Sequence, residues 1–419
     1  MGSGADRVTF RAVFAVREFR AMWAAEALSQ AGDQLARVAL AVLVYGRTES
    51  AALTGLTYAL TLAPSFLGGV FLSGLADRFP RRTVMVVSDL SRAGLIALVA
   101  VPGMPFWTLC VLVGLVSFTQ APFKAAQLAL LPDVLPGDAY VVGMGIRTIT
   151  MQTAQTIGFA GGGLLLTAVG PPTAMLLDAL TFVVSAAFVW FGVTSRPAPA
   201  RPDDAPEADS FGRSAAQGGR LIWRDAGLRT LTVFSWLSAL LIVYEGLAAP
   251  YTAEIGGGPA AVGLILAADP LGSAIGAFVF TRWVAARRRP RLLGPLMVAS
   301  CVPLLVCLAK PGLVVSVVVF AVAGALGTAV MIQATASFSR GVPDHRRAQA
   351  LGLLQSGTAT VQGLGPLLAG GAADAVGTAH TVGLVGVVGL LIAVPAALAW
   401  RNATAARPDV WVATTGDGK

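Results

Sequence analysis

Twelve long apolar stretches, joined mostly by short polar connections, make up nearly all of this chain. A helix needs about 20 apolar residues to cross the hydrocarbon core of a bilayer, and a membrane-spanning backbone must satisfy its own polar groups. The stretches therefore predict an all-α polytopic membrane protein. The twelve expected transmembrane helices cover residues 21–46, 51–76, 83–102, 105–130, 140–169, 171–194, 230–252, 259–283, 291–309, 312–338, 348–374 and 379–400.

The composition excludes a soluble fold. Of 419 residues, 55% are hydrophobic and 12% are charged, whereas a soluble domain carries roughly 25% charged residues. One or two ordinary soluble cores cannot bury so much apolar surface. No cluster of metal-ligating residues stands out, so we expect neither a metal nor another cofactor.

The net charge of +8 would suit a nucleic-acid-binding protein, but its distribution indicates a membrane orientation instead. Basic residues gather in alternate connections, such as Arg81 and Arg82 after the second stretch and 287–291 after the eighth. The opposite connections carry little beyond Arg47 and Lys310. Because cytoplasmic connections are enriched in Lys and Arg, we place both termini in the cytoplasm. Abundant arginine, alanine and glycine favour a bacterial source, and hence the inner (plasma) membrane. The lipid bilayer, and no nucleic acid, is the expected partner.

One long polar connection divides the chain. Residues 195–228 begin with a stretch rich in proline, alanine and acids that cannot bury a core and is predicted to be disordered. Its end, 211–229, has the pattern of an amphipathic surface helix. We expect an N-terminal six-helix bundle over 1–194, a cytoplasmic linker over 195–228, and a C-terminal six-helix bundle and tail over 229–419.

The two predicted bundles look like copies of each other. Five residues in or just before the fifth stretch recur 207 residues later in or just before the eleventh, and two of the second recur 208 residues later in the eighth. The pairs are Pro136/Pro343, Gly145/Gly352, Gln155/Gln362, Gly158/Gly365, Gly163/Gly370, Gly55/Gly263 and Gly68/Gly276. Parallel repeats of this kind place a substrate site between the halves, near the middle of the membrane.

A polar stripe lies inside the first apolar stretch. Glu26, Gln30, Asp33 and Arg37 are spaced by four, three and four residues, which puts them on one face of a helix. An ionised side chain near the bilayer centre costs roughly 2.5–3.5 kcal/mol, so such residues face a bundle interior or a wet cavity. We predict Asp33, and after it Glu26, as proton-coupling acids. Arg37 is the predicted charge partner of Asp33, either as a switch or as a static pair.

Other spans carry further acids. Asp269 precedes Pro270 and is the C-terminal coupling candidate, or else caps a helix kink. Glu245 and Asp178 lie nearer the outer face, where water can hydrate them. Gln30, Tyr58, Gln152, Gln155, Trp236, Tyr244, Glu245, Gln355 and Gln362 are predicted to line a central cavity, or else to join helices by hydrogen bonds.

Two basic residues in the spans also need partners. Asp89 and Arg92 are one helical turn apart and are expected to pair with each other. Arg147 is predicted either to touch an anionic solute or to extend to the cytoplasmic surface.

The connection after the second stretch reads Ser73-Gly-Leu-Ala-Asp77-Arg78-Phe-Pro-Arg81-Arg82. It resembles the signature loop of the major facilitator superfamily, Gly-x-Leu-Ala-Asp-Arg-x-Gly-Arg-Arg/Lys, with serine and proline at the two glycine positions. The resemblance covers essentially the whole chain and implies two pseudo-symmetric six-helix bundles. It implies a gating role for Asp77 and Arg81, together with Arg78 and Arg82 as partners of the acid. The alternative is a topology signal with a helix cap.

Finer similarity is to the drug-efflux branch of that superfamily, especially macrolide- and siderophore-exporter-like members. It rests on segments 19–23, 28–33 and 131–136. Segment 155–163 resembles the glycine-rich span of antiporters, with Phe159 in place of the usual proline.

The resemblance implies a monomeric secondary transporter, not an enzyme, which exports a small amphipathic organic molecule in exchange for protons by alternating access. No ATP-binding Gly-x-x-x-x-Gly-Lys-Ser/Thr loop occurs in the sequence. The alternatives are uptake of a nutrient or metabolite, and a transporter-like scramblase or sensor that does not cycle.

Overall fold

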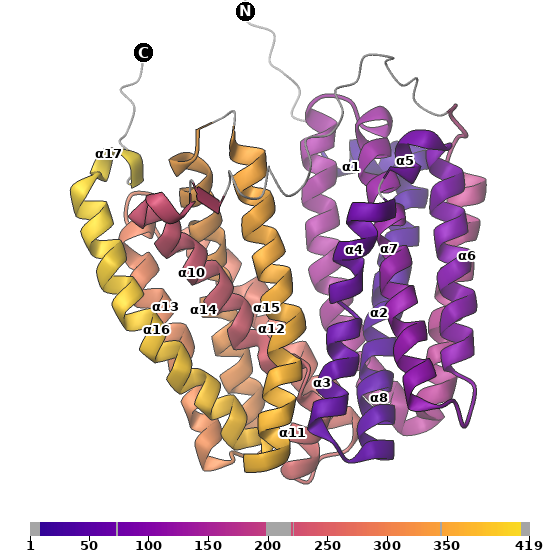
Figure 1. The fold of residues 1–419 in the computed structure, drawn as a ribbon. Coiled ribbons are helices and arrows are strands. Elements are labelled where there is room, and N and C mark those ends of the chain that lie inside the picture. The colour runs from indigo at the N-terminus through magenta and orange to yellow at the C-terminus, as the bar shows by residue number, and fades with distance from the viewer. Residues whose placement is uncertain (1–8, 73, 198–218, 221, 344–345, 412–419) are drawn as a thin grey trace, which may run out of the picture. The chain divides into compact units, whose positions relative to one another are not determined.

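The computed structural model describes residues 9–72, 74–197, 219–220, 222–343 and 346–411, and it is helical without strands in these residues. Contacts divide the chain into two compact units (Figure 1). Unit 1 consists of residues 1–43 and 60–203, and unit 2 of residues 44–59 and 204–419. Residues 44–59, which the sequence places in the first bundle, thus pack with unit 2. Most of the predicted linker lies outside the described residues.

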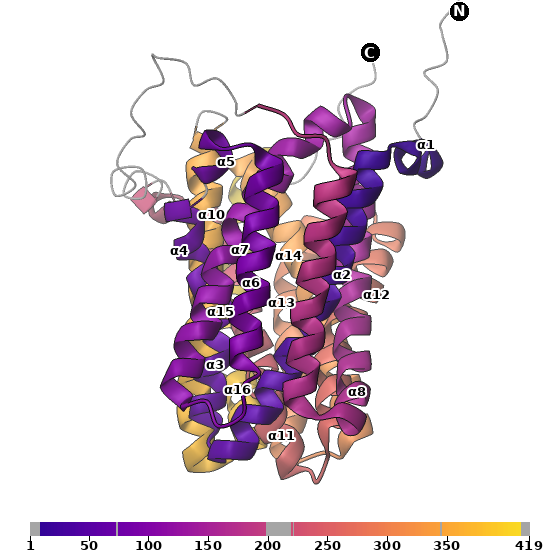
Figure 2. The same ribbon diagram turned by 90° about the vertical axis from the view of Figure 1, so that its right-hand side faces the viewer.

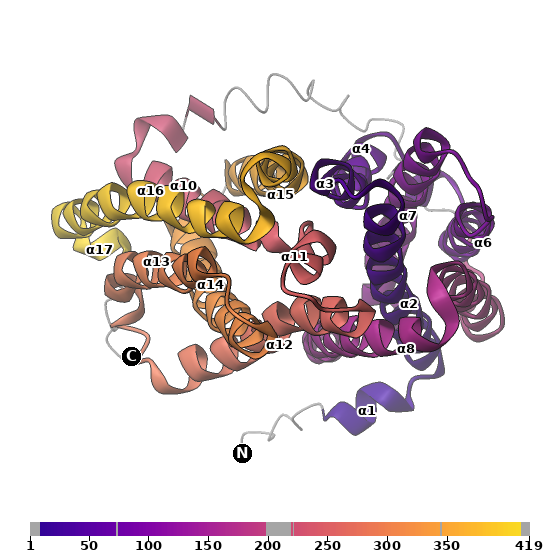
Figure 3. The same ribbon diagram turned by 90° about the horizontal axis from the view of Figure 1, so that it is seen from below.

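Unit 1 is built from long helices that pack side by side. Its core pairs are α6 with α7 and with α8, and α4 with α7, as the view along the helices shows (Figure 3). The elements are α1 (Phe10–Ala15), most of α2 (Arg17–Thr48), α4 (Ala63–Leu72), α5 (Leu75–Arg78), α6 (Arg81–Val99), α7 (Phe106–Val134) and α8 (Asp138–Gly192).

Helix α8 contains the fifth and sixth predicted spans. They are separated at Gly170, which has φ 71° and ψ 165° and breaks the helical path. A positive φ favours glycine, because a Cβ would clash with the backbone. Pro171 and Pro172 follow, and proline is tolerated in the first turn of the helix that restarts there. The predicted boundary between 169 and 171 is confirmed.

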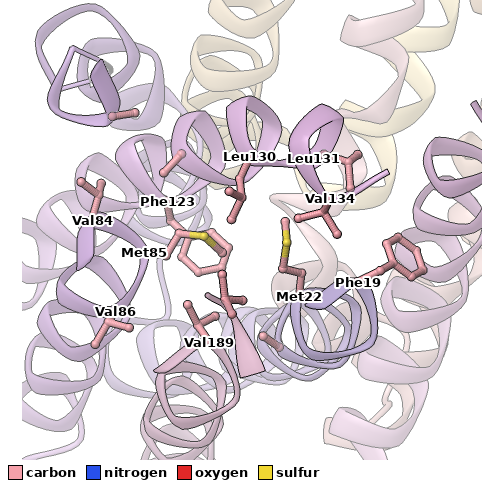
Figure 4. Packing of buried hydrophobic residues seen from close by; sticks show 14 of the residues in the cluster. Phe19, Met22, Val84, Met85, Val86, Phe123, Leu130, Leu131, Val134 and Val189 are labelled. Atoms are coloured by element: carbon pink, nitrogen blue, oxygen red, sulfur yellow. The ribbon is translucent and has the colours of Figure 1, made fainter. Parts of the chain in front are cut away.

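The apolar core of unit 1 fills one end of these helices (Figure 4). Figure 4 shows Met22, Met85 and Leu130 pointing into the space that α2, α6 and α7 enclose. Phe123 and Val189 pack into the same cluster, and all five side chains are less than 5% exposed. Methionine, phenylalanine and branched aliphatic side chains fill this space without leaving polar atoms to satisfy.

Unit 2 contains α3 (Ala51–Leu60) and the helices of the second half (Figure 2). Its main packing pairs are α12 with α14, α13 with α14 and α16, and α10 with α14 and α16. The elements are α10 (Ala226–Leu241), η1 (Ile242–Glu245), α11 (Ala248–Glu254), α12 (Pro259–Trp283), α13 (Arg289–Leu305), η2 (Val306–Ala309), α14 (Leu313–Gly341), α15 (Arg347–Val376), α16 (Thr378–Ala406) and α17 (Pro408–Trp411).

Helix α3 is held closely against α15 within unit 2. The Asp374 carboxylate accepts hydrogen bonds from the backbone N–H of Ala51, at 2.6 Å, and from the hydroxyl of Ser50, at 2.9 Å. It therefore caps the start of α3 from another helix. A Cβ on Gly55 would lie 2.2 Å from the carbonyl oxygen of Pro366, so glycine is required for this approach.

The predicted fold class is confirmed. Among the described residues, eight helices are long and apolar enough to cross a membrane, and α8 alone covers two predicted spans. Helix starts also repeat along the chain, since α3 and α12 begin at 51 and 259, and α6 and α13 at 81 and 289. Both pairs share the offset of 208 residues found in the sequence.

Candidate functional site

A small cavity in unit 1 surrounds Asp33, in the middle of α2. Its volume is about 50 Å³, and its polar lining includes Asp33, Arg37, Arg92, Gln120 and Asp178. A cavity needs roughly 10–15 Å³ to hold an ordered water. The space can therefore carry water between these side chains.

The partner of Asp33 is Arg92 of α6. One guanidinium nitrogen of Arg92 lies 2.7 and 2.9 Å from the two carboxylate oxygens of Asp33. The Arg92 side chain is 2% exposed, and its guanidinium stacks 4.0 Å above the ring of Phe182. Charge-assisted hydrogen bonds of this length are among the strongest that side chains form, so this pair ties α2 to α6.

Arg37 does not take the place that its spacing suggested. Its guanidinium donates a long hydrogen bond of 3.4 Å to Gln34 on its own helix, although it lines the same cavity as Asp33. The structure thus corrects the predicted Asp33–Arg37 pair. An arginine on a neighbouring helix approaches the carboxylate more directly than one a turn further along α2.

Two more carboxylates lie beside this pair. Asp89 is fully buried, accepts a hydrogen bond of 2.6 Å from Ser185, and lies 3.7 Å from the Arg92 guanidinium. The expected Asp89–Arg92 ion pair is therefore present, but it is longer than the Asp33–Arg92 pair. Asp178 of α8 is 1% exposed and accepts a hydrogen bond from Thr181, at 3.2 Å. Asp178 is thus closed off from the outer surface, where the sequence placed it, but it borders the cavity around Asp33.

Glu26 and Arg147 form a second buried pair in unit 1. Two guanidinium nitrogens of Arg147 each lie 2.6 Å from a different oxygen of Glu26, and one also donates to Gln127 at 2.9 Å. This fork-to-fork geometry is the strongest that arginine and a carboxylate adopt. Arg147 thus neither extends to the surface nor leaves its charge open to a solute in this structure.

Unit 2 has a cavity of about 100 Å³ around Asp269. The Tyr244 hydroxyl donates to one carboxylate oxygen at 2.8 Å, and the Ser273 hydroxyl to the other at 3.4 Å. Thr328 in turn donates to Ser273 at 2.7 Å. In contrast to Asp33, Asp269 forms no ion pair with a Lys or Arg of the described residues.

The path of the seventh span breaks beside this cavity. Helix α10 gives way to the short 3₁₀ turn η1, which carries Tyr244 and Glu245, before the chain continues as α11. Glu245 is 7% exposed and accepts a hydrogen bond from the hydroxyl of Tyr58. Like Asp178, Glu245 is therefore buried, although its place in the sequence suggested exposure to water. A 3₁₀ turn inside a longer helix is often found at a functional hinge.

The two cavities occupy equivalent positions of the sequence repeat. Five of the residues that line the unit 2 cavity lie 208 positions after residues that line the unit 1 cavity. The pairs are Asp33/Leu241, Ala36/Tyr244, Thr61/Asp269, Val116/Gly324 and Gln120/Thr328. Each half thus keeps a polar cavity at the same place, but its acid comes from the first span in one half and from the second in the other.

The remaining predicted lining residues lie elsewhere. Gln30, Gln152, Gln155 and Gln362 are half-buried and Gln355 is exposed, and none of them lines the cavities around Asp33 and Asp269. Trp236 lines an apolar groove between α10 and α15 and donates from its indole nitrogen to the Leu354 carbonyl at 3.2 Å.

The signature loop makes contacts within unit 1. Arg81 forms an ion pair of 2.7 Å with Asp133 and donates to the Ala129 carbonyl at 2.8 Å. The Arg82 guanidinium lies 4.3 Å above the Trp190 ring, and Arg78 is exposed. The side chain of Asp77 lies outside the described residues.

Sequence reasoning missed the side chains that complete these clusters. Asp133 lies in segment 131–136, which was noted only as a family resemblance. Gln120, Gln127 and Asp374 had no signal beyond being polar residues in or beside apolar stretches. The polar residue inside an apolar stretch is the signal that would have found them.

Comparisons with known proteins agree on one family. Residues 22–248 and 246–410 match the sequence profile of the Major Facilitator Superfamily. The chain is 26% identical over 368 residues to the multidrug efflux pump Tap of Mycobacterium tuberculosis strain H37Rv, covering 84% of this chain and 85% of Tap. It is 30% identical over 226 residues to the MFS-type transporter YjbB of Bacillus subtilis, a match that spans 51% of this chain and 53% of YjbB.

Solved structures show the same fold. A crystal structure of a bacterial homolog of the human lysosomal transporter Spinster superposes with a TM-score of 0.71 at 14% identity, over 94% of this chain and 98% of that one. The similarity to Tap confirms the predicted resemblance to drug-efflux members. The profile match spans nearly the whole chain, and the chain therefore belongs to the major facilitator superfamily of transporters.

Proposed function

We propose that this chain exports a small amphipathic organic molecule, such as a drug, antibiotic or natural product, in exchange for protons. The observation that carries the proposal is the charged cluster around the unit 1 cavity, in which Asp33 and Asp89 pair with Arg92 and Asp178 borders the same cavity. Buried charges in a membrane span are costly and mark ion or solute pathways. A cluster of acids beside a cavity that can hold water suits proton exchange.

Two further features support an amphipathic cargo. Both cavities are lined by apolar residues, such as Leu40 in unit 1 and Leu241 in unit 2, together with polar ones, whereas a sugar or phosphate needs dense hydrogen bonding. The similarity to Tap, named as a multidrug efflux pump, favours export over uptake. Because the sequence has no ATP-binding loop, the proton gradient is the proposed energy source.

Alternating access is the proposed mode of transport, with the protein acting as a monomer in the bacterial inner membrane and both termini in the cytoplasm. We propose the loop 77–82 as part of the gate. The Arg81–Asp133 ion pair gives that loop a partially exposed contact, and an exposed pair can open at little cost in free energy.

The test uses inside-out membrane vesicles with an acidified interior and a panel of lipophilic antibiotics and dyes. The proposal predicts that some compounds trigger proton release in the wild type and that Asp33→Asn abolishes it. If Glu26→Gln or Asp269→Asn abolishes the release and Asp33→Asn does not, the assignment of proton coupling to the cluster around Asp33 is wrong. No response to any compound, together with accumulation of a nutrient, would overturn export.

A further inference from the structure

Three aspartates lie at or beside the unit 1 cavity, and only two of them form an ion pair with an arginine. Arg92 forms ion pairs with Asp33, at 2.7 Å, and with Asp89, at 3.7 Å. Asp178 borders the same cavity. No Lys or Arg of the described residues forms an ion pair with Asp178, whose carboxylate accepts only the hydroxyl of Thr181 on its own helix.

Close packing prevents Asp178 from turning away. A Cβ on Gly32 would lie 2.3 Å from the Asp178 carboxylate oxygen and 2.3 Å from the Thr181 hydroxyl. The Asp178 carboxylate therefore lies directly against the backbone of α2 at Gly32, the residue that precedes Asp33. Only a glycine permits this approach, so the fold holds two carboxylates at one place.

The other charged groups near Asp178 do not compensate it. On α2 they are Asp33 and Arg37, and on α6 they are Asp89 and Arg92. Arg37 is hydrogen-bonded to Gln34. On α7 the cavity is lined by the neutral Gln120, and Lys124, one turn further along, is exposed and pairs with no described acid.

We propose that Asp178 is the residue that carries the exchanged proton, an inference that rests on the proposed proton coupling. Asp33 is paired with Arg92, and Glu26 is paired with Arg147. A buried carboxylate with no cation in contact with it favours its neutral, protonated form. Asp178 is the one without a cation, so it holds the proton in the structure described here.

The proposed step is a proton transfer. The O–H bond of protonated Asp178 breaks, a water in the cavity takes the proton, and the carboxylate that remains is stabilised by the Arg92 guanidinium. Arg92 can move toward Asp178 when Asp33 loosens its hold, since both acids line the same cavity. Asp33 is then the positioning residue that times the release.

The test is infrared spectroscopy of the purified protein at neutral pH. A protonated buried carboxyl gives a C=O stretching band that shifts in heavy water, and carbon-13 labelling of aspartate separates it from glutamate bands. We expect Asp178→Asn to remove one aspartate component of this band. Glu26→Gln is the matched control, because Glu26 is a buried acid on α2 with its own arginine, and it should leave the band unchanged. A wild-type spectrum without the component, or an unchanged band in Asp178→Asn, overturns the proposal.

Asparagine replaces a neutral carboxyl with a side chain of nearly the same shape, so the variant should fold. Asp178→Ser is a second variant with a smaller polar group, and it should lose the same component. In the transport assay, Asp178→Asn should lose proton release. If the wild type releases no protons, the proposed function fails, while the infrared comparison still decides whether Asp178 is protonated.

Discussion

Replacing Arg92 with methionine should destabilise the protein far more than the same change at Arg37. Both arginines line the unit 1 cavity. Arg92 is 2% exposed and pairs with Asp33 and Asp89, whereas Arg37 has one hydrogen bond of 3.4 Å to Gln34. Methionine keeps an unbranched apolar stem and removes the guanidinium group with its charge and hydrogen-bond donors.

The size of the effect follows from this geometry. Removing one partner of a buried ion pair leaves an uncompensated charge and costs about 3–5 kcal/mol. A loss of 1 kcal/mol shifts the melting temperature by roughly 2–4 °C in a domain of 150–250 residues. Arg92→Met should therefore lower it by on the order of 10 °C. Arg37→Met loses one hydrogen bond, which contributes about 1 kcal/mol.

The assay is thermal unfolding in detergent, followed by intrinsic tryptophan fluorescence. The double variant Arg92→Met with Asp33→Asn should recover part of the lost stability, because it removes the unpaired carboxylate together with the cation. Equal melting temperatures for Arg92→Met and Arg37→Met would refute the Asp33–Arg92 pairing.

Two further predictions concern unit 2. Gly272→Ala should lower the free energy of unfolding by about 1–3 kcal/mol, because the new Cβ would lie 1.9 Å from the Ala321 carbonyl oxygen. Gly161→Ala is the control, since no atom lies within 4 Å of its Cβ position. Equal melting temperatures for the two variants would contradict this prediction. Partial burial alone would raise the pKa of Glu254, but the Lys310 ammonium at 2.7 Å and backbone N–H groups lower it below its ordinary 4.5. Its contribution to stability is therefore present above that value and lost as the pH falls, by less than about 1 kcal/mol. Glu254→Gln should flatten the fall in melting temperature at acid pH, and an unchanged pH profile would count against it.

The spans could be predicted because a bilayer demands about 20 apolar residues from each helix. The break at Gly170 also had a local cause, since Pro171 and Pro172 follow it. Both features depend on residues that are close together in the sequence. The same is true of the polar face on α2, where residues three and four apart must lie on one side of a helix.

The partners across that face could not be predicted in the same way. Asp33 has an arginine one turn away at 37 and another on α6 at 92, and only the packing of α2 against α6 decides between them. The spacing of Asp89 and Arg92 correctly suggested a contact. It could not show that Arg92 approaches Asp33 more closely, because local periodicity carries no information about which helices are neighbours.

The burial of Asp178 depended on a contact between distant residues. Near the outer end of its span, the position suggested hydration, but α2 comes close enough at Gly32 to cover the carboxylate. A glycine preceding an acid inside an apolar stretch, as at 32 and 33, was visible in the sequence. The sequence did not show which residues pack against that glycine.

Proton-driven export is the central claim, and reconstitution tests it most directly. Purified protein is placed in liposomes with an acidic interior, and uptake of a lipophilic antibiotic or dye is measured with and without the proton gradient. Only molecules inserted with their predicted cytoplasmic face outward are active in this assay. The account predicts accumulation that requires the gradient and disappears in Asp33→Asn and Asp178→Asn. Accumulation that persists after the gradient is collapsed, or is equal in both variants and the wild type, would contradict it.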